Sequence, residues 1–148
     1  MSNNYPYVDE HDFNCDYIKR RRTMKKLFIS CPMKGRTEEN IRNSMERMHK
    51  IAEATFGEEL EIIPTYIEDN PPENVKQALW YLGESIKKMA EADYFIGIRF
   101  ESAFAGCGVE RNVASEYGIP STYVDISIVM PDAWEIANRN YTAVQCPR

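Results

Sequence analysis

The sequence predicts an α/β protein, in which a parallel sheet is covered by helices on both faces. Short apolar runs rich in β-forming residues alternate along the chain with longer amphipathic stretches. Within these runs the apolar residues are nearly continuous, which is typical of strands buried on both faces. Because the chain has 148 residues, we expect a single domain with a sizeable core.

The composition argues against several functional classes. With 43% hydrophobic and 28% charged residues it is ordinary for a soluble globular protein, and the net charge of −5 disfavours a nucleic-acid binder that relies on a broad basic surface. No apolar run approaches the roughly 20 residues that span a bilayer, and the polar, acidic N-terminus does not resemble a secretory signal. The cysteines are scattered without a CxxC pair. We therefore expect a cytoplasmic protein with reduced thiols, no zinc site and no membrane partner.

The first expected elements are an appendage and a buried strand. Residues 1–23 form an arm that ends in the basic run KRRR, which either is solvated or contacts nucleic acid or an acidic partner. The domain proper is expected over 24–148, beginning with a strand from Lys26 to Cys31. A turn follows that holds two cations and one glycine, in the order Pro32, Met33, Lys34, Gly35 and Arg36.

A long helix is predicted from Thr37 to Phe56. Thr37 is a suitable N-cap, Glu38 and Glu39 suit the first turn, and Gly57 ends the helix. Its apolar residues fall on one face: Ile41, Met45, Met48, Ile51 and Ala52.

A second strand and a second helix come next. The strand is expected from Leu60 to Tyr66, and Pro64 should either end it or place it at a sheet edge. A loop follows from Ile67 to Glu73, and the helix then runs to about Ala92. We expect its inward face to be formed by Val75, Ala78, Leu79, Leu82, Ile86, Met89 and Ala90.

The third strand, from Tyr94 to Ile98, leads into the most informative stretch. We expect a loop that tightens into Gly106-Cys107-Gly108, and then a helix with Glu110 in its first turn that Gly118 ends. A last strand begins at Ser121–Val124. A short helix around Asp132–Ala137 and an irregular tail complete the chain. This order of elements is that of a Rossmann-like (flavodoxin-like) fold.

Ligands bind such sheets beyond the carboxyl ends of the strands. Three loops meet there, over residues 31–36, 67–70 and 99–110. The predicted fold therefore places Lys34, Arg36, Asp69 and Glu110 on one rim.

Three segments resemble the nucleoside 2-deoxyribosyltransferase-like family, and its short phage and bacterial members of unassigned function above all. They are FISCPMKGR, ESIKKMAEAD and GCGVERNVASEYGIP, and the similarity covers roughly residues 24–125. The resemblance implies that Glu110 attacks the anomeric carbon of a nucleoside, that the base leaves, and that another base or water resolves the glycosyl-enzyme. Gly106 and Gly108 match the family's glycine loop, and the helix N-terminus would keep Glu110 ionised. Alternatively, Glu110 only complements the helix dipole.

The sequence departs from the family at two positions. Ser85, beside Glu84, stands where characterised members have an aspartate that handles the base. Phe104 stands where relatives have an acidic or serine residue that serves the sugar or phosphate end. Phe104 either stacks on a base or caps the core.

Other rim residues are candidates with ordinary alternatives. Lys34 and Arg36, on either side of Gly35, either bind a 5′-phosphate or form a solvated turn. Asp69 either protonates the leaving base or belongs to a turn, and Asp93 orders the pocket or caps its strand. Cys31, Met33 and Cys107 are candidate substrate contacts, and cysteine–histidine catalysis is not expected because no histidine is near either cysteine in sequence.

The sequence thus predicts cleavage or base exchange at the N-glycosidic bond of a nucleoside or nucleotide through Glu110. The alternatives are a non-catalytic nucleotide-binding protein on the same scaffold, and an interaction protein that uses the basic arm. No metal or redox cofactor is expected, because there is no ligand cluster and a carboxylate nucleophile needs none. The resemblance implies a homo-oligomer, for which Trp80 and Tyr81 are plausible anchors.

Overall fold

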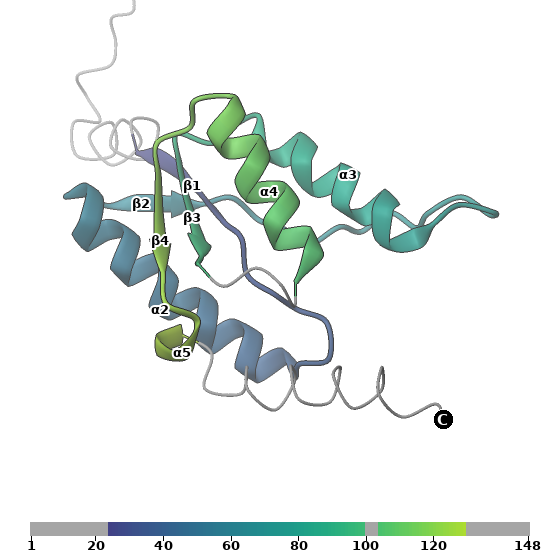
Figure 1. Cartoon of the computed structure of the whole chain (residues 1–148), viewed down its shortest axis with the longest axis horizontal. Coiled ribbons are helices and arrows are strands. Elements are labelled where there is room, and N and C mark those ends of the chain that lie inside the picture. Colours follow the sequence, from purple (N-terminus) through teal and green to yellow (C-terminus); the bar gives the residue numbers. More distant parts are fainter. Residues whose placement is uncertain (1–23, 100–103, 130–148) are drawn as a thin grey trace, which may run out of the picture.

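The computed structural model of the protein describes residues 24–99 and 104–129 (Figure 1). The predicted arm over 1–23, the predicted helix at Asp132–Ala137 and the tail lie outside the described residues. None of the helices within those ranges combines the length and the apolar character needed to cross a membrane.

The core of the molecule is a four-stranded, fully parallel sheet in the order β2-β1-β3-β4. The strands are β1 (Lys25–Ile29), β2 (Leu60–Ile62), β3 (Tyr94–Ile98) and β4 (Ser121–Val124). Strand β2 lies at an edge and ends before Pro64, as the proline suggested. The α/β, Rossmann-like prediction is confirmed.

Helices cover both faces of the sheet (Figure 1). One face packs against α2 (Glu38–Phe56) and the short α5 (Ile126–Val129), through a cluster that includes Leu27, Ile29, Met48 and Ala52. The other packs against α3 (Gln77–Met89) and α4 (Ala105–Glu116), through the cluster Phe28, Ile63, Met89, Phe95 and Ala114. Neighbouring strand residues point to opposite faces, so Leu27 and Phe28 enter different clusters.

Helix α2 begins and ends as the sequence predicts. Thr37 Oγ1 accepts a hydrogen bond from the backbone N–H of Asn40 at 3.1 Å, and Gly57 ends the helix at φ 76°. Strand β1, however, ends at Ile29 rather than Cys31. The backbone N–H of Ser30 still donates to Ile96 O at 2.9 Å, so the chain leaves the sheet just beyond Ser30.

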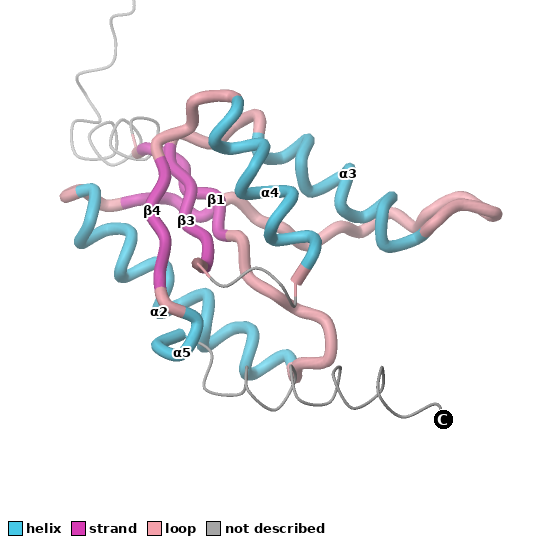
Figure 2. The backbone as a smooth tube through the Cα atoms, in the orientation of Figure 1, coloured by secondary structure: helices cyan, strands magenta, loops and turns pink. Residues whose placement is uncertain are grey.

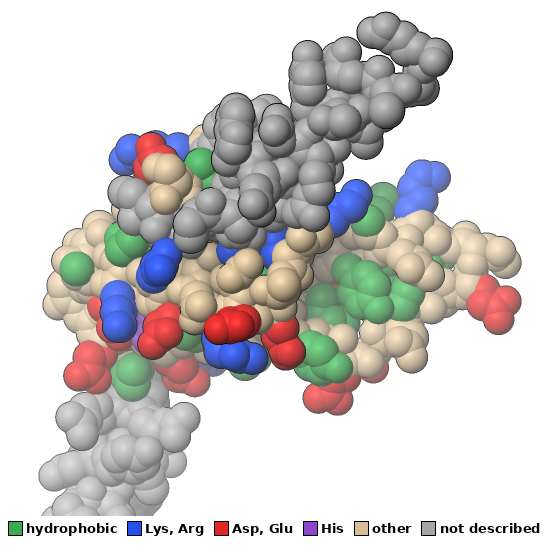
Figure 3. All heavy atoms as spheres, turned by 90° about the horizontal axis from the view of Figure 1, so that it is seen from below, with side chains coloured by type: hydrophobic (Ala, Val, Ile, Leu, Met, Phe, Trp, Pro, Cys, Tyr) green, Lys and Arg blue, Asp and Glu red, His purple; other side chains and the backbone are tan. Residues whose placement is uncertain are grey.

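The predicted inward face of α3 is only partly buried. Met89 is buried, whereas Val75, which precedes the helix, and Leu79 are 41% and 61% exposed. Ala78 and Ala90 are also exposed, and Leu82 and Ile86 are half-buried. The loop over residues 63–76 runs out beyond the sheet and returns to α3 (Figure 2), so the beginning of α3 has no strand beneath it. Hydrophobic side chains gather near this projecting end (Figure 3).

The sheet also fixes where a ligand would bind. From β1 the chain moves to β2 on one side and later crosses to β3 on the other. The carboxyl ends of β1 and β3 therefore flank the point at which the strand order changes direction, which is where open α/β sheets hold their ligands.

Candidate active site

Glu110 lies in the second turn of α4, which differs from the expectation. The helix begins at Ala105, and the backbone N–H of Gly108 donates to Phe104 O at 3.2 Å. Gly106, Cys107 and Gly108 thus form the first helical turn and not a loop. Phe104, at the N-cap, is only 8% exposed and packs in the cluster with Leu27 and Ile29. Of its two predicted roles the structure supports the cap on the core, and this anchor explains why the helix starts early.

The Glu110 carboxylate is held by two serine hydroxyls. Ser30 Oγ donates to Oε1 at 2.6 Å, and Ser85 Oγ donates to Oε2 at 2.7 Å. Ser30 follows β1 and Ser85 lies in α3, so the carboxylate joins α4 to the end of β1 and to the neighbouring helix. Each carboxylate oxygen thereby has a short hydrogen bond from a different element.

The electrostatics of Glu110 also differ from the expectation. Burial raises the pKa of its carboxyl group, and the hydrogen bonds from Ser30 and Ser85 lower that pKa and offset part of the rise. The prediction that a helix N-terminus keeps Glu110 ionised is therefore wrong. The helix dipole acts on charges in the first turn, and Glu110 lies beyond that turn. The serines, not the helix terminus, support the charge.

Two cysteines belong to the same neighbourhood. Burial is the main cause that raises the pKa of the Cys107 thiol to about 12. The neighbouring Ser30 hydroxyl lowers this pKa, whereas the charges of Glu110 and Cys31 raise it further. Cys31 is itself buried at 7% exposure. Cys107 therefore remains protonated at physiological pH.

Arg36 holds the loop between β1 and α2. Its Nη1 donates to Pro32 O at 2.9 Å, and its Nη2 donates to Asn40 O at 3.2 Å and to Ser44 Oγ at 2.6 Å. Nη1 also lies 3.6 Å from Cys31 Sγ. Met33 and Lys34 are exposed, and Gly35 takes the left-handed conformation at φ 78°. Of the expected cation pair, Arg36 therefore has a structural task that Lys34 does not share.

We expect Arg36→Ala to lower the stability of the protein by about 1–3 kcal/mol, because it removes charge-assisted hydrogen bonds to Pro32 O, Asn40 O and the buried Ser44 hydroxyl. Lys34→Ala, in the same loop, is expected to stay within about 0.5 kcal/mol of wild type. Urea unfolding followed by circular dichroism measures both changes. Equal stability of the two variants would contradict the structural role of Arg36.

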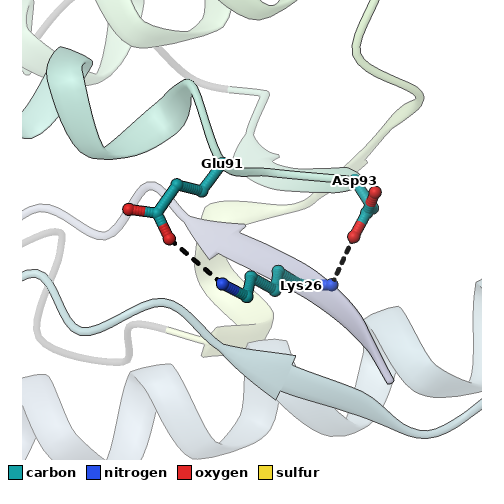
Figure 4. A network of polar contacts seen from close by, with 3 residues as sticks. All are labelled: Lys26, Glu91 and Asp93. Atoms are coloured by element: carbon teal, nitrogen blue, oxygen red, sulfur yellow. Dashed lines mark hydrogen bonds and ion pairs between the residues drawn. The ribbon is translucent and has the colours of Figure 1, made fainter. Parts of the chain in front are cut away.

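The two predicted catalytic aspartates are not brought to Glu110. Asp93 precedes β3 and so lies at the amino end of the sheet, where its Oδ2 accepts from the backbone N–H of Lys26 at 2.8 Å (Figure 4). Lys26 Nζ also pairs with Glu91 at 3.1 Å. Asp93 therefore binds the beginning of the neighbouring strand β1 and does not cap its own strand β3. Asp69 is exposed in the projecting loop over residues 63–76 (Figure 2).

Ser30 is the site residue that the sequence reasoning missed. It ends the run KLFIS and is 1% exposed. A hydroxyl at the carboxyl end of an otherwise apolar strand was the available signal, because a buried polar group needs a partner. The structure thus brings together Glu110, Ser85, Cys107 and Cys31 from the predicted set, and adds Ser30.

Comparisons with protein-family models, curated proteins and solved structures find no match to this chain. Within residues 24–99 and 104–129, no group of three or more His, Cys, Asp or Glu side chains is arranged to hold a metal ion.

Proposed function

We propose that the protein cleaves or exchanges the N-glycosidic bond of a nucleoside or nucleotide, with Glu110 as the nucleophile. The observation that carries the proposal is the Glu110 carboxylate, held by Ser30 and Ser85 at the point where the strand order of the sheet changes direction. The resemblance to nucleoside 2-deoxyribosyltransferase-like proteins supplies the reaction class. Hydroxyl donors on both oxygens suit a carboxylate that must stay ionised while buried.

In the proposed reaction an oxygen of Glu110 attacks the anomeric carbon. The bond from that carbon to the base breaks, and the base leaves with the electron pair and takes up a proton. Attack by water or by a second base on the resulting ester frees Glu110 again. Because burial raises the pKa of Glu110 and only the ionised form attacks, turnover should rise with pH on the acid side of its profile.

A second candidate function is nucleotide binding without turnover. It is favoured by the same contacts, since hydroxyls at 2.6 and 2.7 Å occupy both oxygens of Glu110 as they would in a purely structural network. Incubation with a panel of nucleosides and nucleoside monophosphates, followed by chromatography for free base, separates the two. Release of base supports catalysis, whereas saturable binding without release supports the second function.

We further propose that nucleoside monophosphates bind several-fold more tightly than the matching nucleosides, through the exposed Lys34. Because Arg36 is engaged within its loop, Lys34→Ala is the variant that tests this without disturbing the fold. The affinity gap should shrink in this variant and at high salt. Equal affinity of wild type for both ligands, measured by calorimetry at low salt, would exclude a phosphate contact.

The protein is also proposed to be a cytoplasmic homo-oligomer, most simply a dimer. Leu79 is 61% and Tyr81 37% exposed in α3, and the Tyr81 ring meets Trp80 edge-on with centroids 5.2 Å apart. Exposed aromatic and apolar side chains of these types are enriched at subunit contacts. Light scattering at micromolar concentration should give a dimer mass for wild type and a smaller mass for Leu79→Glu. A monomeric wild type would overturn the proposal.

A further inference from the structure

Two hydroxyl groups converge on Glu110 from different elements. Ser30, which follows β1, donates to Glu110 Oε1 at 2.6 Å. Ser85 approaches the other oxygen from α3 at 2.7 Å.

The number of protons in these contacts fixes their direction. An ionised carboxylate can only accept, so Ser30 and Ser85 must each donate their single hydroxyl proton to Glu110. Cys107, three residues before Glu110 in α4, does not add a second negative charge nearby, because burial raises the pKa of its thiol to about 12.

We propose that Ser30 and Ser85 are positioning residues that hold Glu110 in its ionised, attacking orientation. This proposal rests on the proposed role of Glu110 as nucleophile. It assigns Ser85, which stands where the resemblance implies a residue that handles the base, to the support of the carboxylate instead.

Each hydroxyl has a specific task in this arrangement. Because the two serines come from different elements, they fix the plane of the carboxylate as well as its charge. Removal of either hydroxyl leaves one partly buried oxygen without its donor, which disfavours the ionised form of Glu110. Glu110 should then titrate at higher pH. Because each hydrogen bond stabilises the charged form of Glu110, its loss should lower turnover at neutral pH roughly 10- to 100-fold in each variant.

The test measures the titration of Glu110 directly, by carbon NMR of protein labelled at glutamate side-chain carboxyls, with the signal assigned by its loss in Glu110→Gln. We expect Glu110 to titrate at higher pH in Ser30→Ala and in Ser85→Ala than in wild type. The acid limb of the turnover profile should move the same way.

Ser115→Ala is the matched control, since Ser115 is an exposed serine of α4. It should leave the titration and the turnover unchanged. An unchanged Glu110 titration in Ser30→Ala and Ser85→Ala would overturn the proposal. If Ser30→Ala does not fold, the half-buried Ser85 still allows the test through Ser85→Ala alone. The titration needs no substrate, so a shifted titration in a protein that releases no base would contradict the proposed function alone.

Discussion

Glu110→Gln is expected to lower the release of base roughly a thousandfold or more while nucleoside binding persists. The amide oxygen of glutamine is neutral and cannot form the glycosyl ester, so the two-step route is lost. Glutamine has nearly the same shape and can still accept a hydrogen bond from one serine and donate to the other. The loss should therefore appear in kcat and not in the affinity for substrate. Turnover at the wild-type rate would remove Glu110 from the mechanism.

The same variant has a stability signature that shows whether the fold is intact. Burial raises the pKa of Glu110 in the folded protein above its value in the unfolded chain, so the folded state binds this proton more tightly. The contribution of this group to stability then falls as pH rises through the folded pKa. We expect Glu110→Gln to melt above wild type at neutral pH, and the difference to vanish below about pH 4, where the carboxyl is protonated in both states.

Phe95→Ala is expected to have the largest effect on stability, about 3–5 kcal/mol, or roughly 10 °C in melting temperature. Phe95 is fully buried in β3, where its ring stacks on Phe28 with centroids 5.8 Å apart and meets Tyr123 edge-on at 6.4 Å. Its cluster also contains Ala114 of α4. The loss should therefore loosen the helix that carries Glu110, and reduce turnover at temperatures below the melting point.

Tyr117→Ala is the control for this experiment, because Tyr117 is an aromatic residue at the end of α4 but is 81% exposed. We expect it to change stability by no more than about 0.5 kcal/mol. Calorimetric melts of both variants give the comparison. A Phe95→Ala protein as stable as Tyr117→Ala would mean that this cluster does not hold the α4 side of the sheet.

The elements whose limits the sequence predicted well have strong local signals. Strand β3 matches the apolar run from Tyr94 to Ile98. Helix α2 begins after the side-chain cap of Thr37 and ends at Gly57 in its left-handed conformation, and both signals act on residues a few positions away. Such signals do not depend on the rest of the fold. The parallel arrangement followed from the uninterrupted apolar strands.

The errors arose where tertiary contacts decide. Glycines at 106 and 108 suggested a loop, but burial of Phe104 sets the helix start before them, so Glu110 moves to the second turn. The apolar pattern of α3 predicted the helix but not which of its residues are buried. Leu79, expected on the inward face, is exposed within the described residues. The contact between Ser30 and Glu110 joins residues 80 positions apart, which local patterns do not encode.

The most direct test of the central claim is to trap the covalent intermediate. A nucleoside with fluorine at the 2′ carbon destabilises an oxocarbenium-like transition state, so that the glycosyl ester should accumulate when its hydrolysis becomes slower than its formation. Intact-mass spectrometry of wild type should then show one added fluorosugar, and peptide mapping should place it on Glu110, with no addition to Glu110→Gln. Release of base from this substrate with the adduct on another residue would contradict the account.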